Sequence, residues 1–488
     1  MSAAPDSSMS ANVFAISALR PATVARAGTT GAGATGPVEG ATGPVEGATG
    51  PVEGATSPVE GATGMLAAAM TATAGAAGIV ADATMGAGRP MPNAAHDLSP
   101  VRTAVMRVAF ITHYADMLGA NRSLLNLIDG LRAYGVESFV VTPDLGDFTK
   151  ALAERGIAFR ELAIQEWWSE PTAKRNRWQR LYLNLRVLPH LVSQLRKWRV
   201  QVVYSNSSVI CAGQVAARLL RLPHIWHFRE FGDLDYGMRL DWGKRFFNFL
   251  ISKAQAQIAI SNAIRDHLLQ AQAKEKIHVI YNGIAPASEF DRLHLEAAQR
   301  DWGCQPFNFL VIGMFHPAKQ QEEAIRAFAQ VVKQVPAAQL LLAGPADNNY
   351  GKSCRDLVTT LGLSNRVTFL DYVADPFPVY LQAHTLLMCS KHEGMGRVTA
   401  EAMATCLPVI GRNSGATPEL IQHEQTGLLY DGSINALVTC MTQLARNPAQ
   451  ARQLGMNGWE VARQKFTVET YSQQVFAVLE SVCPVRAE

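Results

Sequence analysis

Short apolar runs alternate with stretches of helical periodicity through most of the chain, and this alternation limits the fold more than any other feature. The first series of apolar runs lies at residues 105–111, 138–142, 200–204, 224–227, 257–261 and 278–281. Helix-spaced leucines and an isoleucine at residues 124–131 separate the first two runs. Strands that alternate with helices indicate a parallel sheet covered by helices on both faces.

A second series of apolar runs follows the first. It lies at residues 309–313, 339–343, 367–370, 385–389 and 408–411. Two series predict an α/β chain with two Rossmann-like domains that face a cleft, at residues 104–295 and 296–488, with a last helix placed to cross back to the first domain. Ligands bind outside the carboxyl ends of strands in open parallel sheets, so the loops after the strands are the place to look for chemistry.

The first hundred residues differ in composition from the rest. From Gly33 a seven-residue unit, GATGPVE, repeats with small changes, and its Pro and Gly residues exclude a coiled coil. We predict a disordered tail at residues 1–103. Met106 opens a string that resembles the start of an enzyme, so residues 1–105 are expected to be dispensable.

Composition excludes several classes of protein. A net charge of +3 is too small to indicate nucleic acid as a global partner. The seven cysteines are scattered without a C-x-x-C pair, which argues against structural zinc and favours a reducing cytoplasm. Asp233 and Asp235 form a D-x-D string, which metal-dependent sugar transferases of a different fold use to bind a metal. Nothing else in the sequence fits that fold, so we do not expect these aspartates to bind a metal. No metal and no cofactor are expected.

The most informative segment is EGMGRVTAE, from Glu393 to Glu401. Gly394 and Gly396 lie where the backbone must approach a ligand, and a helix is expected to start near Val398. Backbone amides at a helix start form an anion site that suits a diphosphate. Glu401 lies two helical turns beyond Glu393, so both carboxylates can face one side and accept hydrogen bonds from sugar or ribose hydroxyls. The alternative is an acidic helix cap followed by an exposed glutamate.

This block, the strand LPVIG and the strings SGATPELI and QTGLLY resemble the donor-binding region of the retaining GT-B glycosyltransferases of group 1, family four. The resemblance extends over most of residues 106–480. It implies transfer of a sugar from a nucleoside-diphosphate sugar, as co-substrate, to an acceptor hydroxyl with retention of configuration.

The resemblance also implies roles for single residues. Glu401 would bind the ribose, Lys319 the diphosphate and Glu393 the sugar. The implied catalytic residues are Glu393, His227 and Lys319, and the implied donor-binding residues are Gly119, Arg122, Gly313, Lys319, Gly394, Met395, Gly396, Arg397, Val398 and Glu401. The family often has Arg and Gly where this chain has Met314 and Gln320, so neutralisation of the phosphates is expected to depend on Lys319 together with Arg397.

In the first domain, the segment 118–124 resembles the family's Gly-rich loop, whose amides would face the donor phosphates; a simple strand-to-helix turn is the alternative. His227 would hydrogen-bond a sugar hydroxyl or the acceptor, or else be a histidine without a role. Some relatives have a histidine where this chain has Asn206.

Residues 171–200 contain eight Lys or Arg, no acid and several aromatic residues. This composition suits contact with anionic lipid headgroups, and a solvated helix over the sheet is the alternative. We therefore expect a glycan or lipid-linked glycan acceptor, as in surface-polysaccharide or glycolipid assembly, no nucleic acid, and a cytoplasmic location that includes the inner face of the cell membrane. Two rivals remain open: a nucleotide-sugar epimerase of the same architecture, and a non-catalytic nucleotide-sugar-binding protein.

Overall fold

A computed structural model describes residues 105–169, 176–303 and 305–484. The predicted tail at residues 1–103 lies outside these residues, and so do Lys174 and Arg175 of the basic segment. No helix in the described part of the chain is both long and apolar enough to cross a bilayer.

The first sheet has seven parallel strands among the described residues, in the order β3-β2-β1-β5-β6-β8-β9. Its strands are β1 (Met106–Ile111), β2 (Val136–Thr142), β3 (Ala158–Glu161), β5 (Val202–Ser205), β6 (His224–Phe228), β8 (Ala256–Ala259) and β9 (Ile277–Val279). The helices of this half are α1 (Gly119–Leu131), η1 (Arg132–Tyr134), α2 (Asp147–Glu154), α3 (Arg177–Lys197), α4 (Ala212–Leu220), α5 (Asp233–Tyr236), α6 (Gly243–Ser252), α7 (Asn262–Leu268) and η2 (Lys274–Lys276).

The second sheet has six parallel strands in the described chain, in the order β12-β11-β10-β13-β14-β15. They are β10 (Asn308–Ile312), β11 (Gln339–Ala343), β12 (Val367–Leu370), β13 (Thr385–Met388), β14 (Val409–Arg412) and β15 (Gly427–Tyr430). The remaining helices are α8 (Ala287–Ala297), η3 (Pro317–Lys319), α9 (Gln321–Gln334), α10 (Asn349–Thr360), α11 (Phe377–Gln382), α12 (Arg397–Ala404), α13 (Thr417–Leu420), α14 (Ile434–Arg446), α15 (Pro448–Lys465) and α16 (Val468–Val482).

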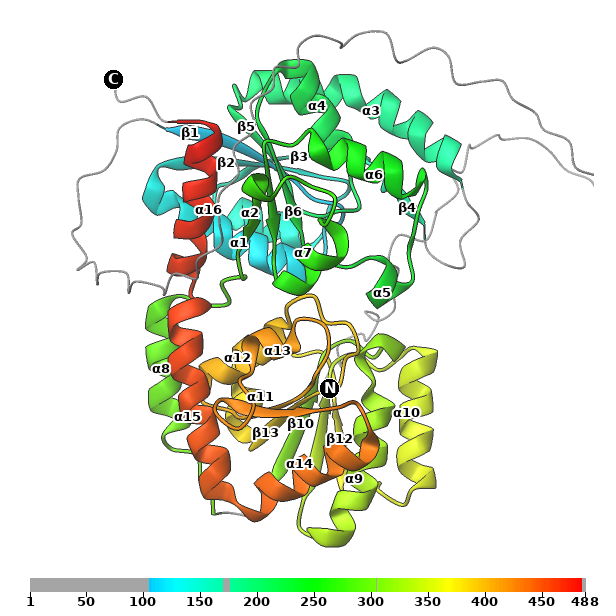
Figure 1. The fold of residues 1–488 in the computed structure, drawn as a ribbon, viewed down its shortest axis with the longest axis vertical. Helices are drawn as coiled ribbons and strands as arrows, with labels where there is room; N and C mark the ends of the chain where they lie inside the picture. Colours follow the sequence, from blue (N-terminus) through cyan, green and yellow to red (C-terminus); the bar gives the residue numbers. More distant parts are fainter. Residues whose placement is uncertain (1–104, 170–175, 304, 485–488) are drawn as a thin grey trace, which may run out of the picture. The chain divides into compact units, whose positions relative to one another are not determined.

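The predicted pair of Rossmann-like α/β domains is confirmed (Figure 1). Every apolar run of both series coincides with a strand, because a strand covered by helices on both faces is apolar throughout. The sequence analysis missed the edge strand β3, whose residues are mostly exposed. It also missed the edge strand β15, and a two-stranded antiparallel ribbon of β4 (Trp168–Ser169) and β7 (Arg239–Leu240).

The chain passes from one domain to the other along two adjacent segments. The amide of Ile284 donates to the carbonyl of Phe466, and the amide of Val468 donates to the carbonyl of Ala285. Helix α8 then packs against α11, α12 and α15 of the second domain. The chain has therefore entered the second domain before residue 296, where the sequence analysis placed the boundary, because Pro286 starts α8 directly after the crossing.

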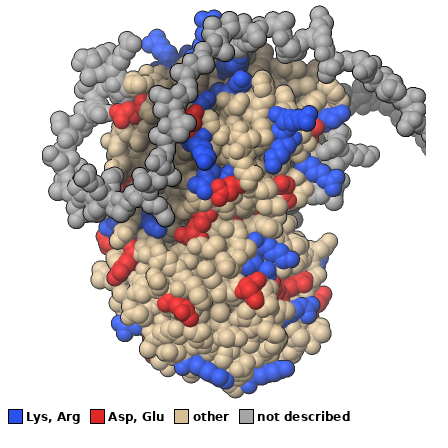
Figure 2. All heavy atoms as spheres, viewed as in Figure 1, with Lys and Arg blue, Asp and Glu red and all other residues tan. Residues whose placement is uncertain are grey.

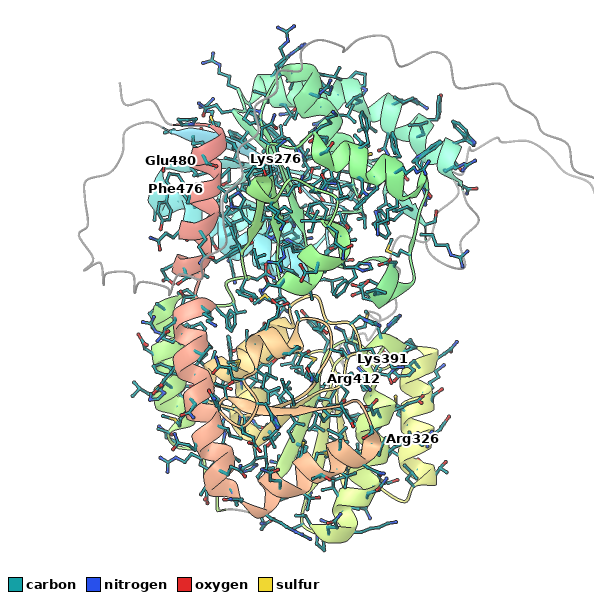
Figure 3. All side chains as sticks on the ribbon, in the orientation of Figure 1. Lys276, Arg326, Lys391, Arg412, Phe476 and Glu480 are labelled. Atoms are coloured by element: carbon teal, nitrogen blue, oxygen red, sulfur yellow. The ribbon has the colours of Figure 1, made fainter. Side chains whose placement is uncertain are left out.

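The last helix, α16, packs along α1 of the first domain. Phe476, labelled in Figure 3, stacks on Tyr134 with ring centroids 4.7 Å apart. The contact is close at Gly130, where a Cβ atom would lie 2.6 Å from the Ser472 hydroxyl. The C-terminal helix therefore ties the second domain back to the first.

Candidate functional site

The strand order in each sheet reverses at one point, and in doubly wound folds such a point marks the ligand crevice. In the first sheet the reversal falls between β1 and β5, and in the second it falls between β10 and β13. Lys319 follows β10, and Glu393 follows β13. The two residues therefore come from the two loops that flank the reversal of the second sheet.

Lys319 and Glu393 form an ion pair, with Nζ 2.7 Å from Oε2. The Lys319 side chain is 30% exposed and the Glu393 side chain 15% exposed, so a ligand can still reach the cation. Burial by itself would lower the pKa of Lys319, but the Glu393 carboxylate, with Tyr236 and Asp235, outweighs burial and raises it. Lys319 therefore stays positively charged at neutral pH, as a phosphate ligand must.

The backbone around Glu393 is held by two glycines. Gly396 is the N-cap of α12 in a left-handed conformation (φ 79°), which favours glycine. Gly415 lies so close that a Cβ atom would be 2.7 Å from the Glu393 amide nitrogen. The amide of Ala416 also donates to the Glu393 carbonyl at 2.9 Å. The SGATPEL string thus braces the loop that carries Glu393, and helix α12 starts at Arg397, one residue before the predicted start.

Glu401 is buried and has partners of its own. Its Oε1 accepts from Arg397 Nη2 at 3.0 Å, and its Oε2 accepts from the Tyr380 hydroxyl at 3.0 Å. Glu393 and Glu401 therefore have different partners. Each carboxylate oxygen has a second lone pair, so Glu401 can accept a further hydrogen bond.

The segment 118–124, predicted as a Gly-rich loop, instead forms the start of α1 after Leu118, and it faces this region. Arg397 Nη1 donates to the Ser123 hydroxyl at 2.8 Å, and a Cβ atom at Gly119 would lie 3.7 Å from Arg397 Cδ. Arg122 Nη2 donates to the Tyr372 hydroxyl at 2.8 Å. The side chain of Arg397, the first residue of α12, thus contacts the N-terminal turn of α1.

The middle of the EGMGRV loop contacts the first domain. The Met395 sulfur accepts from the Asn282 amide at 3.1 Å, and a Cβ atom at Gly394 would lie 3.2 Å from the Arg229 carbonyl oxygen. Val398, in the first turn of α12, is half-buried. A glycine at position 394 therefore favours the close approach of this loop to Arg229.

Gly313 and Gln320 lie in the segment between β10 and α9, which also carries Lys319. Gln320 is one of the two positions at which this segment differs from the family pattern. Gly313 has a φ of 142°, which requires glycine. Gln320 has a left-handed φ of 56°, and its side chain donates to the Pro317 carbonyl at 2.6 Å. The glycine that the family often has here suits this backbone, and the glutamine adopts the same conformation with its own hydrogen bond.

His227 is fully buried at the end of β6. Its Nδ1 hydrogen-bonds the Tyr204 hydroxyl at 2.6 Å, and its Nε2 has no hydrogen-bond partner among the described residues. Burial, with the nearby Arg229 charge, lowers the pKa of His227 well below its usual value, so the ring is neutral. The ring lies 5.7 Å from the Tyr204 ring and 6.4 Å from the Tyr471 ring of α16, and its contact with a sugar or acceptor stays a prediction.

Two residues just beyond His227 have polar partners that the sequence analysis missed, and Arg229 also contacts α16 and the loop that carries Gly394. Arg229 donates to Asn206, Asn282 and Tyr471 of α16. Glu230 accepts from the Ser207 and Ser208 hydroxyls at 2.6 and 2.9 Å. A signal was present, because both residues directly follow a strand and parallel strands collect their ligands at that end.

Helix α5 brings two more groups toward the Lys319–Glu393 pair. The Tyr236 ring lies 5.9 Å from the His316 ring, and Tyr236 and Asp235 both interact electrostatically with Lys319. Asp233 instead bonds His267 at 2.7 Å. The two aspartates of the D-x-D string thus have different surroundings, and only Asp235 is coupled to the pair.

Asp235 should make stability depend on pH. Burial, followed by the Glu230 charge, raises the pKa of Asp235 from 3.8 to about 7. Between these values the folded chain holds a proton that the unfolded chain releases, so the stability that this proton contributes is lost as the pH rises. We expect Asp235→Asn to melt at a higher temperature than the native chain at pH 8 and to show a clearly smaller gain at pH 5 in thermal denaturation, because only part of the window between the two pKa values has been crossed at pH 5. Asp233→Asn, exposed on the same short helix, is the matched control, and an equal gain at both pH values would contradict the assignment.

A bridge between the domains lies at Glu419. Its carboxylate accepts from the amides of Asn262 and Ala263, at 2.8 and 2.7 Å, and from the Tyr281 hydroxyl at 2.9 Å. An acidic side chain at the start of α7 is favourable because helix amides there lack partners. The glutamate of the SGATPEL string thus joins the second domain to the first.

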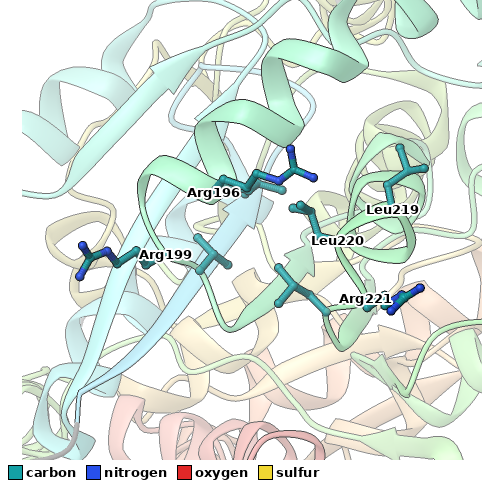
Figure 4. A pocket seen from close by; sticks show the side chains of 8 residues that line it. Arg196, Arg199, Leu219, Leu220 and Arg221 are labelled. Atoms are coloured by element: carbon teal, nitrogen blue, oxygen red, sulfur yellow. The ribbon is translucent and has the colours of Figure 1, made fainter.

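A separate hollow of about 310 Å³ lies between the C-terminal ends of α3 and α4, and three arginines and several leucines line it. These helices lead into β5 and β6, so the hollow lies at the amino ends of those strands, away from the site. The side chains of Arg196, Arg199 and Arg221 point in different directions (Figure 4). They do not converge on one anion.

Two family models match the chain. The model described as "Glycosyltransferase Family 4" matches residues 118–288, and the model described as "Glycosyl transferases group 1" matches residues 297–461. The first match covers the first sheet except β1, and the second covers all six strands of the second sheet. Lys319, Glu393 and Glu401 lie within the second.

Curated relatives are similar over parts of their length. The N-acetyl-alpha-D-glucosaminyl L-malate synthase of Bacillus anthracis is 28% identical over 231 residues, which are 46% of this chain and 59% of that protein. A D-inositol 3-phosphate glycosyltransferase of Rhodococcus opacus is 29% identical over 36% of this chain and 44% of its own length. The capsular polysaccharide biosynthesis glycosyltransferase CapM of Staphylococcus aureus is 25% identical over 62% of this chain and 81% of its own. The chain thus spans about half the length of the first two relatives.

Solved structures share the fold. The structure of HepE from Anabaena, in complex with UDP and glucose, has a TM-score of 0.64 and 23% identity and covers 77% of this chain and 100% of its own. A glycosyltransferase from Rickettsia africae has a TM-score of 0.65 and 17% identity, with coverage of 78% and 100%. At these identities the likeness concerns the fold alone.

Proposed function

This chain belongs to the group 1 glycosyltransferases of family four, which have the GT-B fold, and we propose that it transfers a sugar from a nucleoside-diphosphate sugar to an acceptor hydroxyl. The observation that carries the proposal is the Lys319–Glu393 ion pair, which lies beyond the two strands that flank the reversal of the second sheet. A diphosphate joined to a sugar needs a cation for its phosphates and, next to it, a hydrogen-bond acceptor for the sugar hydroxyls. Lys319 and Glu393 offer these two groups side by side.

Each part of the donor has a matching group. Lys319 would neutralise the diphosphate, and the amides at the starts of α1 and α12 would bind its oxygens. Arg397 begins α12, reaches Ser123 of α1 and would add a second charge. Glu401 would accept a hydrogen bond from the ribose through a free lone pair, while Arg397 and Tyr380 hold it in place. Glu393 would accept from sugar hydroxyls.

The chemistry proposed for this site is departure of the diphosphate with retention at the anomeric carbon. Lys319 and the helix amides would stabilise the negative charge that develops on the leaving diphosphate, and fixed donors of this kind contribute strongly to catalysis. We assign no protein nucleophile. We propose that transfer needs no metal ion, so that EDTA leaves the rate unchanged.

The proposed acceptor is a glycan or a lipid-linked glycan in surface-polysaccharide or glycolipid assembly. The relative CapM is described as a capsular polysaccharide biosynthesis glycosyltransferase, which supports this class. We propose that the enzyme works in the cytoplasm at the inner face of the membrane, where residues 171–200 would contact anionic lipid. Calorimetry with a panel of nucleoside diphosphates would identify the base.

Glu393→Gln should abolish measurable transfer and leave nucleotide binding nearly unchanged. The glutamine keeps the size of the side chain but loses the charge that pairs with Lys319 and the second acceptor oxygen. Transfer is measured as product formed with a panel of nucleotide sugars and glycan acceptors, and nucleotide binding by calorimetry.

The rivals give other outcomes in the same assay. A native chain that binds a nucleotide sugar but transfers no sugar to any acceptor would be a binding protein. A native chain that releases an isomerised nucleotide sugar without an acceptor would be an epimerase. Glu424→Gln, at an exposed position away from the pair, is the matched control and should transfer at the native rate.

A further inference from the structure

The first half of α3 carries an apolar stripe that no described part of the chain covers. Trp178, Leu181, Tyr182 and Leu185 recur at helix spacing on one face. Trp178 is 64% exposed, and Tyr182 and Leu185 are each 57% exposed. In the second half of the helix, Leu191 and Leu195 are instead fully buried. The helix is therefore anchored by its C-terminal half and presents its N-terminal half outward.

Helix α6 also presents aromatic side chains outward. Phe247 and Ile251 are buried against the core, but Phe246 is 42% and Phe249 57% exposed. Lys253 Nζ lies 4.8 Å from the centre of the Phe249 ring. This helix thus has one face in the core and a second apolar face with basic residues beside it.

The two faces join into one surface. The Trp178 ring meets the Trp242 ring edge-on at 4.8 Å, and Trp242 lies 6.4 Å from Phe246. The Arg177 guanidinium lies over both tryptophans, at 5.7 and 5.4 Å. We call this the aromatic–basic surface; its residues are Arg177, Trp178, Leu181, Tyr182, Leu185, Arg186, Trp242, Lys244, Arg245, Phe246, Phe249 and Lys253.

The charge of this surface has a single sign. Neither residues 176–199 nor residues 242–257 contain Asp or Glu. Lys and Arg side chains gather over the ends of α3 and α6 in Figure 2. Arg180 is not part of the surface, because it is paired with the buried Asp241. The charge is therefore uncompensated where the aromatic rings are exposed.

This combination favours one occupant. A second copy of the chain would set like charges against each other, since a symmetric contact pairs a surface with itself. At the surface of an anionic bilayer, rings enter the headgroup boundary while basic groups remain with the phosphates. The surface also lies close to the site along the chain, since only β7 and its flanking residues separate Tyr236 from Trp242.

We propose that the aromatic–basic surface docks the enzyme on anionic membrane, so that a lipid-linked acceptor enters the site from the bilayer. The proposal rests on the proposed function for the identity of the acceptor, and membrane docking itself can be tested without any transfer. The sequence analysis expected the segment 171–200 to contact lipid. The surface proposed here is instead built by two helices. Only the first half of α3 takes part, and α6 supplies the rest.

The test is flotation of the full chain with vesicles of phosphatidylcholine alone or with about one third phosphatidylglycerol. We expect the native chain to float with the anionic vesicles, and the triple variant Trp178→Ala, Phe246→Ala, Phe249→Ala to lose about tenfold or more in affinity. Lys244→Glu with Arg245→Glu should lower binding similarly, because it reverses charge beside the rings. Leu295→Ala with Leu361→Ala, exposed elsewhere, is the matched control and should float like the native chain.

Several results would overturn the proposal: no flotation of the native chain, equal flotation with neutral vesicles, or flotation that the triple variant keeps. Light scattering that finds a dimer, dissociated by the triple variant, would assign the surface to a second copy instead. Nucleotide binding by the variants is measured in parallel as a check of folding. Normal flotation without any sugar transfer would contradict the proposed function and leave the docking surface standing.

Discussion

Replacing Lys319 with alanine should lower the rate of sugar transfer by about 10²–10³-fold, the usual effect of removing one fixed group that stabilises charge in the transition state. The variant loses the cation proposed to neutralise the departing diphosphate. It also leaves the Glu393 carboxylate, 15% exposed, without its partner and next to the donor phosphates. Transfer is measured as initial rate at saturating donor, with donor affinity measured separately by calorimetry.

Two comparisons make the Lys319 result specific. Lys333→Ala removes an exposed lysine from the far end of α9 and should transfer at the native rate. Lys319→Arg keeps the charge but changes its geometry, and should retain more activity than alanine. A fully active Lys319→Ala enzyme would remove Lys319 from the proposed mechanism.

Asp241→Ala should destabilise the chain by about 3–5 kcal/mol, because it leaves a largely buried cation without its counter-charge. The Asp241 side chain is 1% exposed and that of Arg180 19% exposed. Arg180 Nε donates to Asp241 Oδ2 at 3.1 Å, and Asp241 also accepts from the Ser169 hydroxyl. This pair joins α3 to the turn before α6, so the same variant should weaken flotation with anionic vesicles.

The measurement is urea denaturation followed by tryptophan fluorescence. The double variant Arg180→Leu, Asp241→Leu should lose less stability than Asp241→Ala, since it removes both charges together. Asp147→Ala, in an exposed ion pair with Lys150, is the control and should change little. An unaltered midpoint for Asp241→Ala would mean that the pair does not hold α3 in place.

Much of the fold could be predicted because its signals are local. A strand between two helical layers must be apolar along its whole length, so β1, β10 and β13 stand out from the sequence alone. Edge strand β3 is mostly exposed and lacked this signal. The sequence analysis placed the domain boundary at residue 296, near the end of α8, because contacts with α11, α12 and α15, rather than periodicity, assign that helix to the second domain.

The candidate site, like the fold, has features that the sequence predicts and features that it does not. The glycines of the EGMGRV loop and the positions of Lys319 and Glu393 after strands follow from the sequence, because backbone conformation and strand ends depend on neighbouring residues. The roles of Arg229 and Asp235 do not. Both depend on groups more than 50 residues away, Asn282 for Arg229 and Lys319 for Asp235.

The amino-acid sequence by itself determined two α/β domains and the loops in which their polar residues lie, since both depend on short-range periodicity and turn chemistry. Only the tertiary structure decided which of those loops meet. The strand order places the loops after β10 and β13 side by side and so pairs Lys319 with Glu393. It also decided that His227 is enclosed while Arg229 reaches α16 and the Gly394 loop, because both faces of β6 are buried and no periodicity along such a strand distinguishes inside from outside.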